Sequence, residues 1–242
     1  NYPLGALLKE RDLHMDMSRE SGPRSDAHMA RYALAAAWVR PGDTVLDCAC
    51  GYGYGTAILA ACSRGGRFIG VDVEPEVIRY ASDHFSTASP VEYMHGDAGN
   101  LDSISDASID VLVTFETIEH VRDYQAFLRE ARRVIKPDGR IIAGVPNLWM
   151  DETGKDPNPY HYHVFDYPKL RAALEDNGFM VEARYSQSAP GGFKLTDSRR
   201  LLIKQRLDQD ENEPDTEWCL LVASSNPLDR VVADYRHPEF GT

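Results

Sequence analysis

Short, mostly apolar runs alternate with helical patterns between residues 44 and 179. The apolar runs predict five buried strands, at 44–50, 67–73, 91–97, 109–116 and 140–147. Apolar residues at helical spacing predict helices between them, over 55–64, from Pro75 to about 85, and over 123–136. Near-continuous apolar strands that alternate with helices are typical of a parallel sheet covered on both faces.

The pattern changes after the fifth strand. A helix is predicted over 166–179, where Gly178 provides a stop signal. Two strand-like runs, at 180–189 and 217–224, predict an antiparallel hairpin, because no helical crossover is needed between them. The insertion between these runs, at about 190–216, is predicted to contain a short helix over 198–207 and a solvated acidic loop.

The first 40 residues are mostly helical in pattern, and the segment 26–39 predicts a helix that is capped by Asp26 and packs on the sheet. We therefore expect a helical N-terminal cover at 1–40, one α/β domain at 41–225 and a loose tail at 226–242.

Composition narrows the possible functions. The formal net charge of −12 argues against a general nucleic-acid binder, because phosphate binding needs a basic surface. No apolar run is long enough to predict a membrane span. The four cysteines have neither redox nor zinc-site spacing, which predicts small buried side chains with free thiols and a cytoplasmic location.

The turn after the first predicted strand has glycines at alternate positions: Gly51, Gly53 and Gly55. Such glycines serve either a tightly packed turn or the close approach of a ligand to the backbone. In an open α/β sheet, ligands bind beyond the carboxyl ends of the strands. A helix that begins near Gly55 directs its free N–H groups to the same place.

Three carboxylates end consecutive predicted strands around this turn. Asp72 follows Gly51 by 21 positions and suits the two hydroxyls of a ribose. Asp97 suits an adenine amino group, and Asp47 suits an ammonium or a backbone N–H. The sequence departs from the dinucleotide fingerprint, because Thr56 stands where the third glycine belongs, and it has no triphosphate-binding loop.

Five motifs occur in order over about residues 30–180: "VLDCACGYGYG", "GVDVEPEVI", "EYMHGDAGNL", "DVLVTFETIEHV" and "REARRVIKPDGRIIAGVPN". Together they resemble the class I S-adenosylmethionine-dependent methyltransferases. The resemblance implies a Rossmann-like, seven-stranded, mostly parallel sheet with a reversed C-terminal strand, helices on both faces and a helical N-terminal cover. It also implies S-adenosyl-L-methionine as cofactor and S-adenosyl-L-homocysteine as product.

The resemblance implies a cofactor site along the carboxyl ends of the first four strands. Its expected members are Asp47, Ala49, Cys50, Gly51, Tyr52, Gly53, Gly55, Asp72, Val73, Asp97, Ala98, Phe115 and Glu116. The first-strand residues are expected at the methionine part of the cofactor, Asp72 at the ribose, and Phe115 and Glu116 near the sulfonium.

Catalytic candidates follow the fourth strand in "ETIEHV". His120 is the best candidate base, because its unperturbed pKa lies near neutrality, and Glu119 is expected beside it. A packing role for His120 remains open. A divalent metal held by histidines with Glu119 also remains possible, but the spacing alone does not favour it.

The segment after the fifth strand, "NLWMDETGKDPNPYHYHVFDYPKL", is in the position of a substrate loop. Its expected substrate residues are Asn147, Tyr160, His161, Tyr162 and His163. Polar aromatic side chains suit sugar or phenolic acceptors.

This segment is similar to methyltransferases of bacterial polysaccharide and glycosylated natural-product pathways, which implies a small-molecule or glycan acceptor and methylation of a sugar hydroxyl. Methylation of an aromatic metabolite, carboxyl methylation, a silent cofactor-binding protein and a nicotinamide reductase remain open alternatives. A homodimer is also possible.

Overall fold

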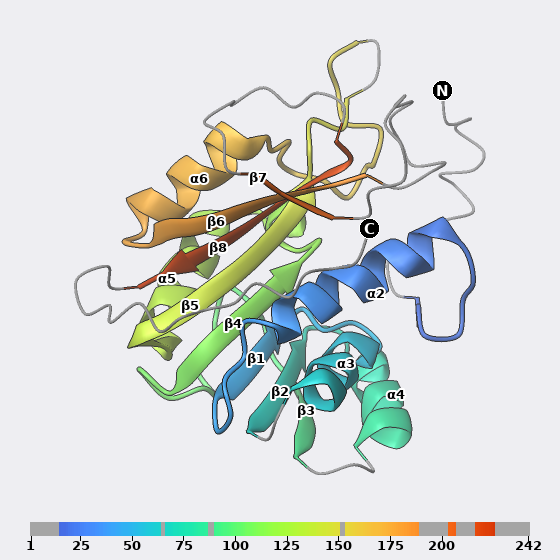
Figure 1. The fold of residues 1–242 in the computed structure, drawn as a ribbon, viewed down its shortest axis with the longest axis vertical. Coiled ribbons are helices and arrows are strands. Elements are labelled where there is room, and N and C mark those ends of the chain that lie inside the picture. The colour runs from blue at the N-terminus through green and yellow to red at the C-terminus, as the bar shows by residue number, and fades with distance from the viewer. Residues whose placement is uncertain are drawn as a thin grey trace.

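In the part of the chain that the structure describes, eight strands form one sheet in the order β3-β2-β1-β4-β5-β8-β6-β7 (Figure 1). The computed structural model describes residues 15–63, 66–86, 90–150, 153–188, 203–206 and 216–225. The strands are β1 (Thr44–Cys48), β2 (Arg67–Asp72), β3 (Val91–His95), β4 (Ile109–Phe115), β5 (Ile135–Pro146), β6 (Met180–Gln187), β7 (Lys204–Arg206) and β8 (Trp218–Ser224). The helices are α2 (Pro23–Ala36), α3 (Tyr54–Cys62), α4 (Pro75–Phe85), α5 (Tyr124–Val134), α6 (Tyr167–Asp176) and the single 3-10 turn η1 (Ile118–His120).

The five predicted parallel strands and the reversed strand are confirmed. Strands β1 to β5 pair in parallel, so that their carboxyl ends lie along one edge of the sheet. Strand β8 runs antiparallel to both β5 and β6, as the predicted hairpin requires. This arrangement is the expected seven-stranded sheet, with β7 added at its edge.

Strand β7 corrects part of the predicted helix at 198–207. Lys204, Gln205 and Arg206 pair with β6 in antiparallel register instead of forming a helical turn. The open edge of β6 offers unpaired backbone groups, and pairing with them outweighs a short helix whose first turn is costly to form. Ile203 precedes β7 outside any helix, and the other residues of the predicted helix lie outside the described ones.

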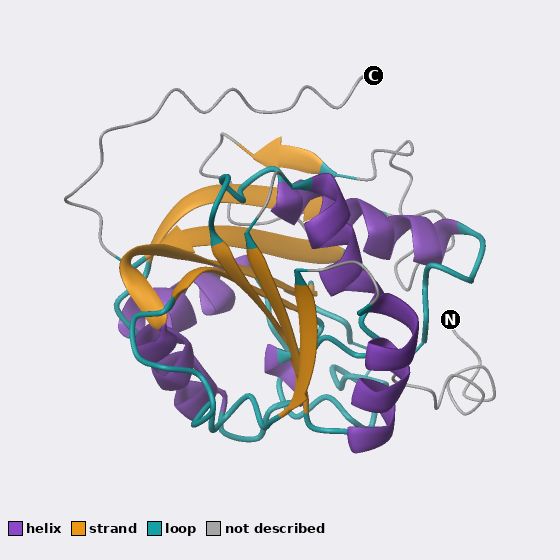
Figure 2. Ribbon diagram, turned by 90° about the horizontal axis from the view of Figure 1, so that it is seen from below, coloured by secondary structure: helices purple, strands orange, loops and turns teal. Residues whose placement is uncertain are grey.

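Both faces of the sheet are buried because alternate residues of each strand point to opposite sides. Leu46 and Leu112 belong to one core cluster, which α5 and α6 cover with residues such as Phe127. Val45 belongs to the other cluster, which α2 and α3 cover with residues such as Leu59. Figure 2 shows the helices on the two sides of the twisted sheet.

Side-chain caps place the starts of α5 and α6, whereas the predicted cap of α2 needs correction. Asp123 and Asp166 cap α5 and α6 by accepting the backbone N–H of Ala126 and Lys169 at 2.9 and 2.8 Å. The predicted cap Asp26 is wrong, because α2 begins at Pro23 and Asp26 lies inside its first turn. A proline without an N–H fits the first helical position, which moves the start of the helix towards the N-terminus.

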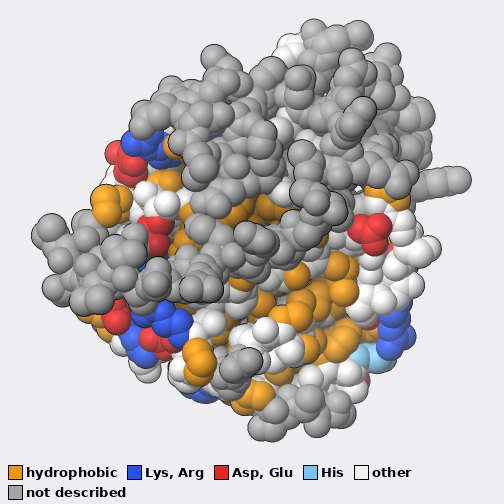
Figure 3. Space-filling view, in the orientation of Figure 1, with side chains coloured by type: hydrophobic (Ala, Val, Ile, Leu, Met, Phe, Trp, Pro, Cys, Tyr) orange, Lys and Arg blue, Asp and Glu red, His pale blue; other side chains and the backbone are white. Residues whose placement is uncertain are grey.

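Surface features agree with the composition. The central part of the visible face in Figure 3 carries mainly apolar side chains, and charged side chains lie towards its rim. All four cysteines are free, and three of them are buried as expected. Cys62 is the exception, because it lies exposed in the last turn of α3. Among the described helices, none has the length and apolar character that crossing a membrane requires. The division into a cover, a domain and a tail remains a prediction, since residues 1–14 and 226–242 lie outside the described ranges.

Candidate functional site

The turn between β1 and α3 is built from unusual backbone conformations. Ala49, Gly51 and Gly53 have φ values of 62°, 53° and 83°, in the left-handed region. Glu116, at the end of the neighbouring strand β4, has a φ of 54°. Non-glycine residues rarely adopt this region, and such strain clusters at functional sites. The carboxyl edge of β1 and β4 is therefore the first candidate for a functional site.

Two of the three turn glycines have a packing reason. A Cβ at Gly53 would come 2.6 Å from the Cβ of Ala81 in α4. A Cβ at Gly55 would overlap the ring of Tyr32 in α2. Tight packing and close approach of a ligand are thus compatible explanations of the glycines. The turn is tightly packed on one side, and it lies at the carboxyl edge of the sheet, where a ligand would bind.

The Asp72 carboxylate holds the glycine turn against β2. Its Oδ2 accepts the N–H of Gly51 at 2.9 Å, and its Oδ1 accepts the N–H of Glu74 at 3.0 Å. The Cys50 N–H donates to the Val71 carbonyl at 2.9 Å and fixes the same turn. Asp72 is therefore a buried carboxylate with a defined orientation at the end of its strand.

The Asp47 carboxylate is buried below the turn, with only 1% of the residue exposed. Thr56 donates its hydroxyl to Oδ2 at 2.7 Å, and Tyr32 donates to Oδ1 at 3.3 Å. Burial raises the pKa of Asp47 to about 7, although these two hydrogen bonds act in the opposite direction. Asp47 thus connects β1, α2 and α3 beneath the candidate cofactor edge.

This pKa predicts a pH-dependent stability. An unfolded Asp has a pKa of about 3.9, so the folded chain binds more protons than the unfolded chain between about pH 4 and pH 7. The contribution of Asp47 is therefore most favourable below about pH 4 and is lost as the pH rises to about 7. At about 1.4 kcal/mol per pKa unit, the loss amounts to a few kcal/mol.

Urea unfolding of the wild type and of Asp47→Asn at pH 5 and pH 8 measures this effect. We expect the fall in unfolding free energy between the two pH values to be smaller in Asp47→Asn, because asparagine does not ionise. An equal fall in both proteins would show that Asp47 does not titrate in this range.

The ends of β2 and β3 form an exposed border beside Asp72. Val73 is 62% exposed, which is unusual for a large apolar side chain that follows a buried strand. His95 Nε2 lies 3.0 Å from the Val73 carbonyl, so the two strand ends are adjacent. Asp97 is exposed and accepts the Gly99 N–H at 2.8 Å, and Ala98 packs partly against the core. Tyr52, on the turn, packs edge-to-face on Tyr80 of α4, with ring centroids 4.7 Å apart.

A buried arginine, which the sequence analysis did not identify, lies at the end of β4. Arg31 of α2 is fully buried and donates from Nη1 to Glu116 Oε1 at 2.7 Å. Its guanidinium lies 4.7 Å from the ring centroid of Trp218. Within the described part of the chain, its Nε and Nη2 have no hydrogen-bond partner. The sequence signal for this residue is a lone arginine in the apolar run "MARYALAA", because an arginine on a buried helix face needs a partner. Phe115 is buried at the same strand end and packs edge-to-face on Tyr32.

The structure brings Glu119, His120 and His161 together, although His161 comes from the loop after β5. One potential ligand atom of each residue lies within 4.8 Å of those of the other two. Glu119 is 1% exposed, and neither of its carboxylate oxygens has a partner among the described residues. Burial raises the pKa of Glu119 well above its usual range, and Glu116 raises it further. Burial also lowers the pKa of His120, with a further contribution from His161.

Backbone hydrogen bonds fasten the loop after β5 over η1. The Tyr162 and His163 N–H groups donate to the Glu119 carbonyl at 2.8 and 3.3 Å. The Tyr160 carbonyl lies 3.0 Å from His120 Nδ1. His161 is thereby held beside residues that precede it by about forty positions in the sequence.

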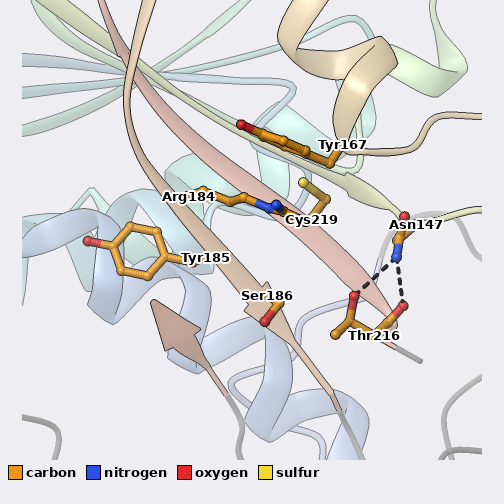
Figure 4. Close-up of a pocket in the computed structure, with 7 residues that line it drawn as sticks. All are labelled: Asn147, Tyr167, Arg184, Tyr185, Ser186, Thr216 and Cys219. Atoms are coloured by element: carbon orange, nitrogen blue, oxygen red, sulfur yellow. Dashed lines mark hydrogen bonds between the residues drawn. The ribbon is translucent and has the colours of Figure 1, made fainter. Parts of the chain in front are cut away.

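The other expected substrate residues have separate contacts. Asn147 donates from Nδ2 to the Thr216 carbonyl and hydroxyl, at 3.2 and 3.1 Å (Figure 4). His163 Nε2 lies about 3 Å from the carbonyls of Val121 and Arg122. Tyr160 and Tyr162 are exposed, and the Arg122 guanidinium lies 4.2 Å from the ring centroid of Tyr162. Of the five expected substrate residues, the structure places His161 in the cluster with Glu119 and His120.

A small cavity lies among the ends of β5, β6 and β8 and the start of α6 (Figure 4). Its lining residues are Asn147, Tyr167, Arg184, Tyr185, Ser186, Thr216 and Cys219. The Arg184 guanidinium lies 3.7 Å from the Tyr167 ring centroid, so these two side chains pack against each other in the cavity wall. This cavity is not part of the candidate site.

Comparison with known proteins agrees with this geometry. The family model described as "Methyltransferase domain" matches residues 46–143, which span the glycine turn, Asp72 and η1. A Mycolicibacterium smegmatis protein that bears the name of an S-adenosylmethionine-dependent methyltransferase is 32% identical over 160 residues. The match covers 65% of this chain and 60% of that protein, so the chain spans less than two thirds of this relative.

Two solved structures share the fold. A chain from the Haloferax volcanii complex between the Trm112 methyltransferase activator and a methyltransferase has a TM-score of 0.64 at 21% identity, and the match covers 92% of this chain and 94% of that one. A Thermotoga maritima S-adenosylmethionine-dependent methyltransferase has a TM-score of 0.61 at 19% identity, with 83% and 91% covered. The strand order and the two solved structures show that the chain has the Rossmann-like fold of these methyltransferases, and residues 46–143 are similar to a methyltransferase domain.

Proposed function

We propose that the protein transfers the methyl group of S-adenosylmethionine to a hydroxyl of a small molecule or glycan, with a sugar hydroxyl as the favoured acceptor. The observation that carries this proposal is the cluster of the buried Glu119 and the half-buried His120, which follow β4, with the half-buried His161 from the loop after β5. A hydroxyl must lose its proton when it is methylated, and these are the side-chain types that assist proton loss.

The residues along the carboxyl edge fit the cofactor. Asp72 would receive the ribose hydroxyls, because its carboxylate is already oriented by the N–H groups of Gly51 and Glu74. Val73 offers an exposed apolar surface for the adenine, with Asp97 and Ala98 at its edge. Arg31 has two buried nitrogen atoms, Nε and Nη2, without a partner among the described residues, and their N–H groups would bind the carboxylate of the methionine part.

The turn residues of β1 complete this assignment. The backbone from Ala49 to Gly53 would line the methionine part, and the buried Asp47 would support the turn from below. When bound, S-adenosylmethionine supplies a methyl group on a positively charged sulfur. Phe115 and Glu116 would flank that sulfur, and the pairing of Glu116 with Arg31 fixes the position of its carboxylate.

His120 and Glu119 are the proposed catalytic residues, on the acceptor side of the methyl group. The hydrogen bond of His120 Nδ1 to the Tyr160 carbonyl fixes the ring, so that Nε2 is available to the acceptor side. Aligning the hydroxyl oxygen, the methyl carbon and the sulfur supplies a large part of the rate in such a displacement.

Aromatic side chains near this group favour a sugar or a phenol. The Trp149 and His161 ring centroids are 6.1 Å apart, and Tyr160 next to them is exposed. Flat aromatic rings beside hydrogen-bonding groups suit the apolar faces and hydroxyls of sugars. Methylation of an aromatic metabolite is the alternative that the same surroundings allow.

Incubation of the purified protein with methyl-labelled S-adenosylmethionine and a fractionated extract of its own cells tests the proposal. We expect label in sugar nucleotides or glycans, and loss of that label in Glu119→Gln. The exposed Glu76→Ala on α4 is the matched control and is expected to transfer label as the wild type does. Label in aromatic metabolites, RNA or protein instead would overturn the proposed acceptor.

A cytoplasmic location and a homodimer remain predictions.

A further inference from the structure

We propose that Glu119, His120 and His161 bind one divalent transition-metal ion, and that zinc fits their donor set best. One ligand atom of each residue lies within 4.8 Å of those of the other two, so small side-chain shifts would bring all three within bonding distance of a single ion. The inference rests on the proposed function, because the ion would lie on the acceptor side of the same active site.

The Glu119 carboxylate supplies the first argument. It is almost completely buried, and neither oxygen accepts a hydrogen bond from any residue that the structure describes. Buried carboxylates are normally paired with a cation or coordinate a metal, because an unpaired buried charge is strongly destabilising. The nearby buried cation Arg31 donates to Glu116 instead. A metal ion would supply the partner that Glu119 lacks.

The hydrogen bonds of the two histidines supply the second argument. His120 Nδ1 lies 3.0 Å from the Tyr160 carbonyl, which can only accept, so Nδ1 carries the proton. His161 Nδ1 lies 2.7 Å from the buried Asp156 carboxylate and carries its proton for the same reason. Histidines that ligate metals almost always donate their other ring N–H to a carbonyl or a carboxylate. Both rings therefore present Nε2 as a metal ligand.

The surroundings hold this donor set in place. The two imidazole rings pack edge-to-face with centroids 4.6 Å apart. The Tyr162 N–H donates to the Glu119 carbonyl, which keeps the His161 loop next to η1. Asn158 Nδ2 lies 3.0 Å from His161 Nε2, which is consistent with a lone pair on that nitrogen. Binding of an ion at Nε2 would replace this one hydrogen bond.

The donor set selects the ion and its chemistry. Two imidazoles and one carboxylate are typical of catalytic zinc with an open fourth position, whereas magnesium and calcium prefer oxygen ligands. The open position would take the acceptor hydroxyl, whose proton leaves to solvent water as its pKa falls. The oxygen lone pair then forms the bond to the methyl carbon, and the carbon–sulfur bond breaks with its electron pair on sulfur.

Calorimetric titration of zinc into the untagged, chelator-treated full chain tests the site directly. We expect one ion per chain, and an affinity at least about 100-fold weaker in Glu119→Gln and His161→Gln. Asp156→Asn is expected to weaken binding about 10- to 100-fold, because it replaces the charged acceptor of the His161 Nδ1–H by a neutral amide. His163→Gln is the matched control, since that histidine bonds to main-chain carbonyls outside the cluster. Its zinc affinity is expected to be unchanged.

Titration of the same samples with S-adenosylhomocysteine separates the two proposals. Variants that lose zinc but keep S-adenosylhomocysteine are folded, and this result would support the site. The proposal is overturned if the wild type binds no stoichiometric zinc, or if Glu119→Gln and His161→Gln bind it as the wild type does. A wild type that binds zinc but no S-adenosylhomocysteine would overturn the proposed function and leave the metal site standing.

Discussion

Replacement of Asp72 by alanine is expected to weaken S-adenosylhomocysteine binding by about 100-fold or more. The carboxylate accepts the N–H groups of Gly51 and Glu74, so its removal loosens the glycine turn as well as the proposed ribose contact. A hydrogen bond to a charged group contributes about 1.5–3 kcal/mol. Loss of the two proposed hydrogen bonds between the carboxylate and the ribose hydroxyls therefore corresponds to a factor of about 100 or more in the dissociation constant.

Calorimetric titration of Asp72→Ala and the wild type measures this loss. Glu76→Ala, which removes an exposed carboxylate from the first turn of α4, is the control and should bind as the wild type does. Circular dichroism of each protein shows whether the variant is folded. A folded Asp72→Ala with less than a fivefold change would contradict the ribose assignment.

Replacement of Gly55 by alanine is expected to lower the unfolding free energy by about 3 kcal/mol. The added methyl group would overlap the buried ring of Tyr32, which packs α2 against the glycine turn. The helix would have to shift, and the shift would also disturb the hydrogen bond between Tyr32 and Asp47. Urea unfolding measures the change.

Two further variants isolate the steric cause. Gly99→Ala has room for its methyl group at 3.4 Å from Asp97 and is expected to change stability by less than about 0.5 kcal/mol. In the double variant with Tyr32→Ala, the Gly55→Ala change should be much less destabilising, because the ring is absent. Equal effects of Gly55→Ala in both backgrounds would show that Tyr32 is not the obstacle.

The sheet could be predicted from sequence because each strand is buried on both faces and reads as an apolar run. The helices α5 and α6 begin one residue after the predicted starts at 123 and 166, because Asp123 and Asp166 are the N-caps that precede them. Strand β7 could not be predicted, because its pairing depends on the distant edge of β6. The start of α2 was misplaced because Asp26 and Pro23 both resemble helix starts, and local sequence does not rank them.

In the candidate site, too, contacts within a short motif could be predicted from sequence, whereas contacts between distant segments could not. The glycine turn and Asp72 lie at a fixed spacing, so a short sequence motif predicts their proximity, as the Gly51 hydrogen bond confirms. Arg31 and Glu116 meet across 85 positions, and His161 meets His120 across 41, which no local pattern reveals. The amide of Asn147 bonds to Thr216, which lies 69 positions later in the sequence, and its expected contact with substrate stays a prediction. Non-local packing decides all of these contacts.

A crystal structure with S-adenosylhomocysteine tests the central claim most directly. The account predicts the ribose hydroxyls on the Asp72 carboxylate, the adenine beside Val73 and Asp97, and the sulfur near Phe115 and Glu116, facing Glu119 and His120. Density for the ligand elsewhere, such as in the cavity among β5, β6 and β8, would contradict the account. So would a site at the glycine turn that takes NADH and excludes S-adenosylhomocysteine.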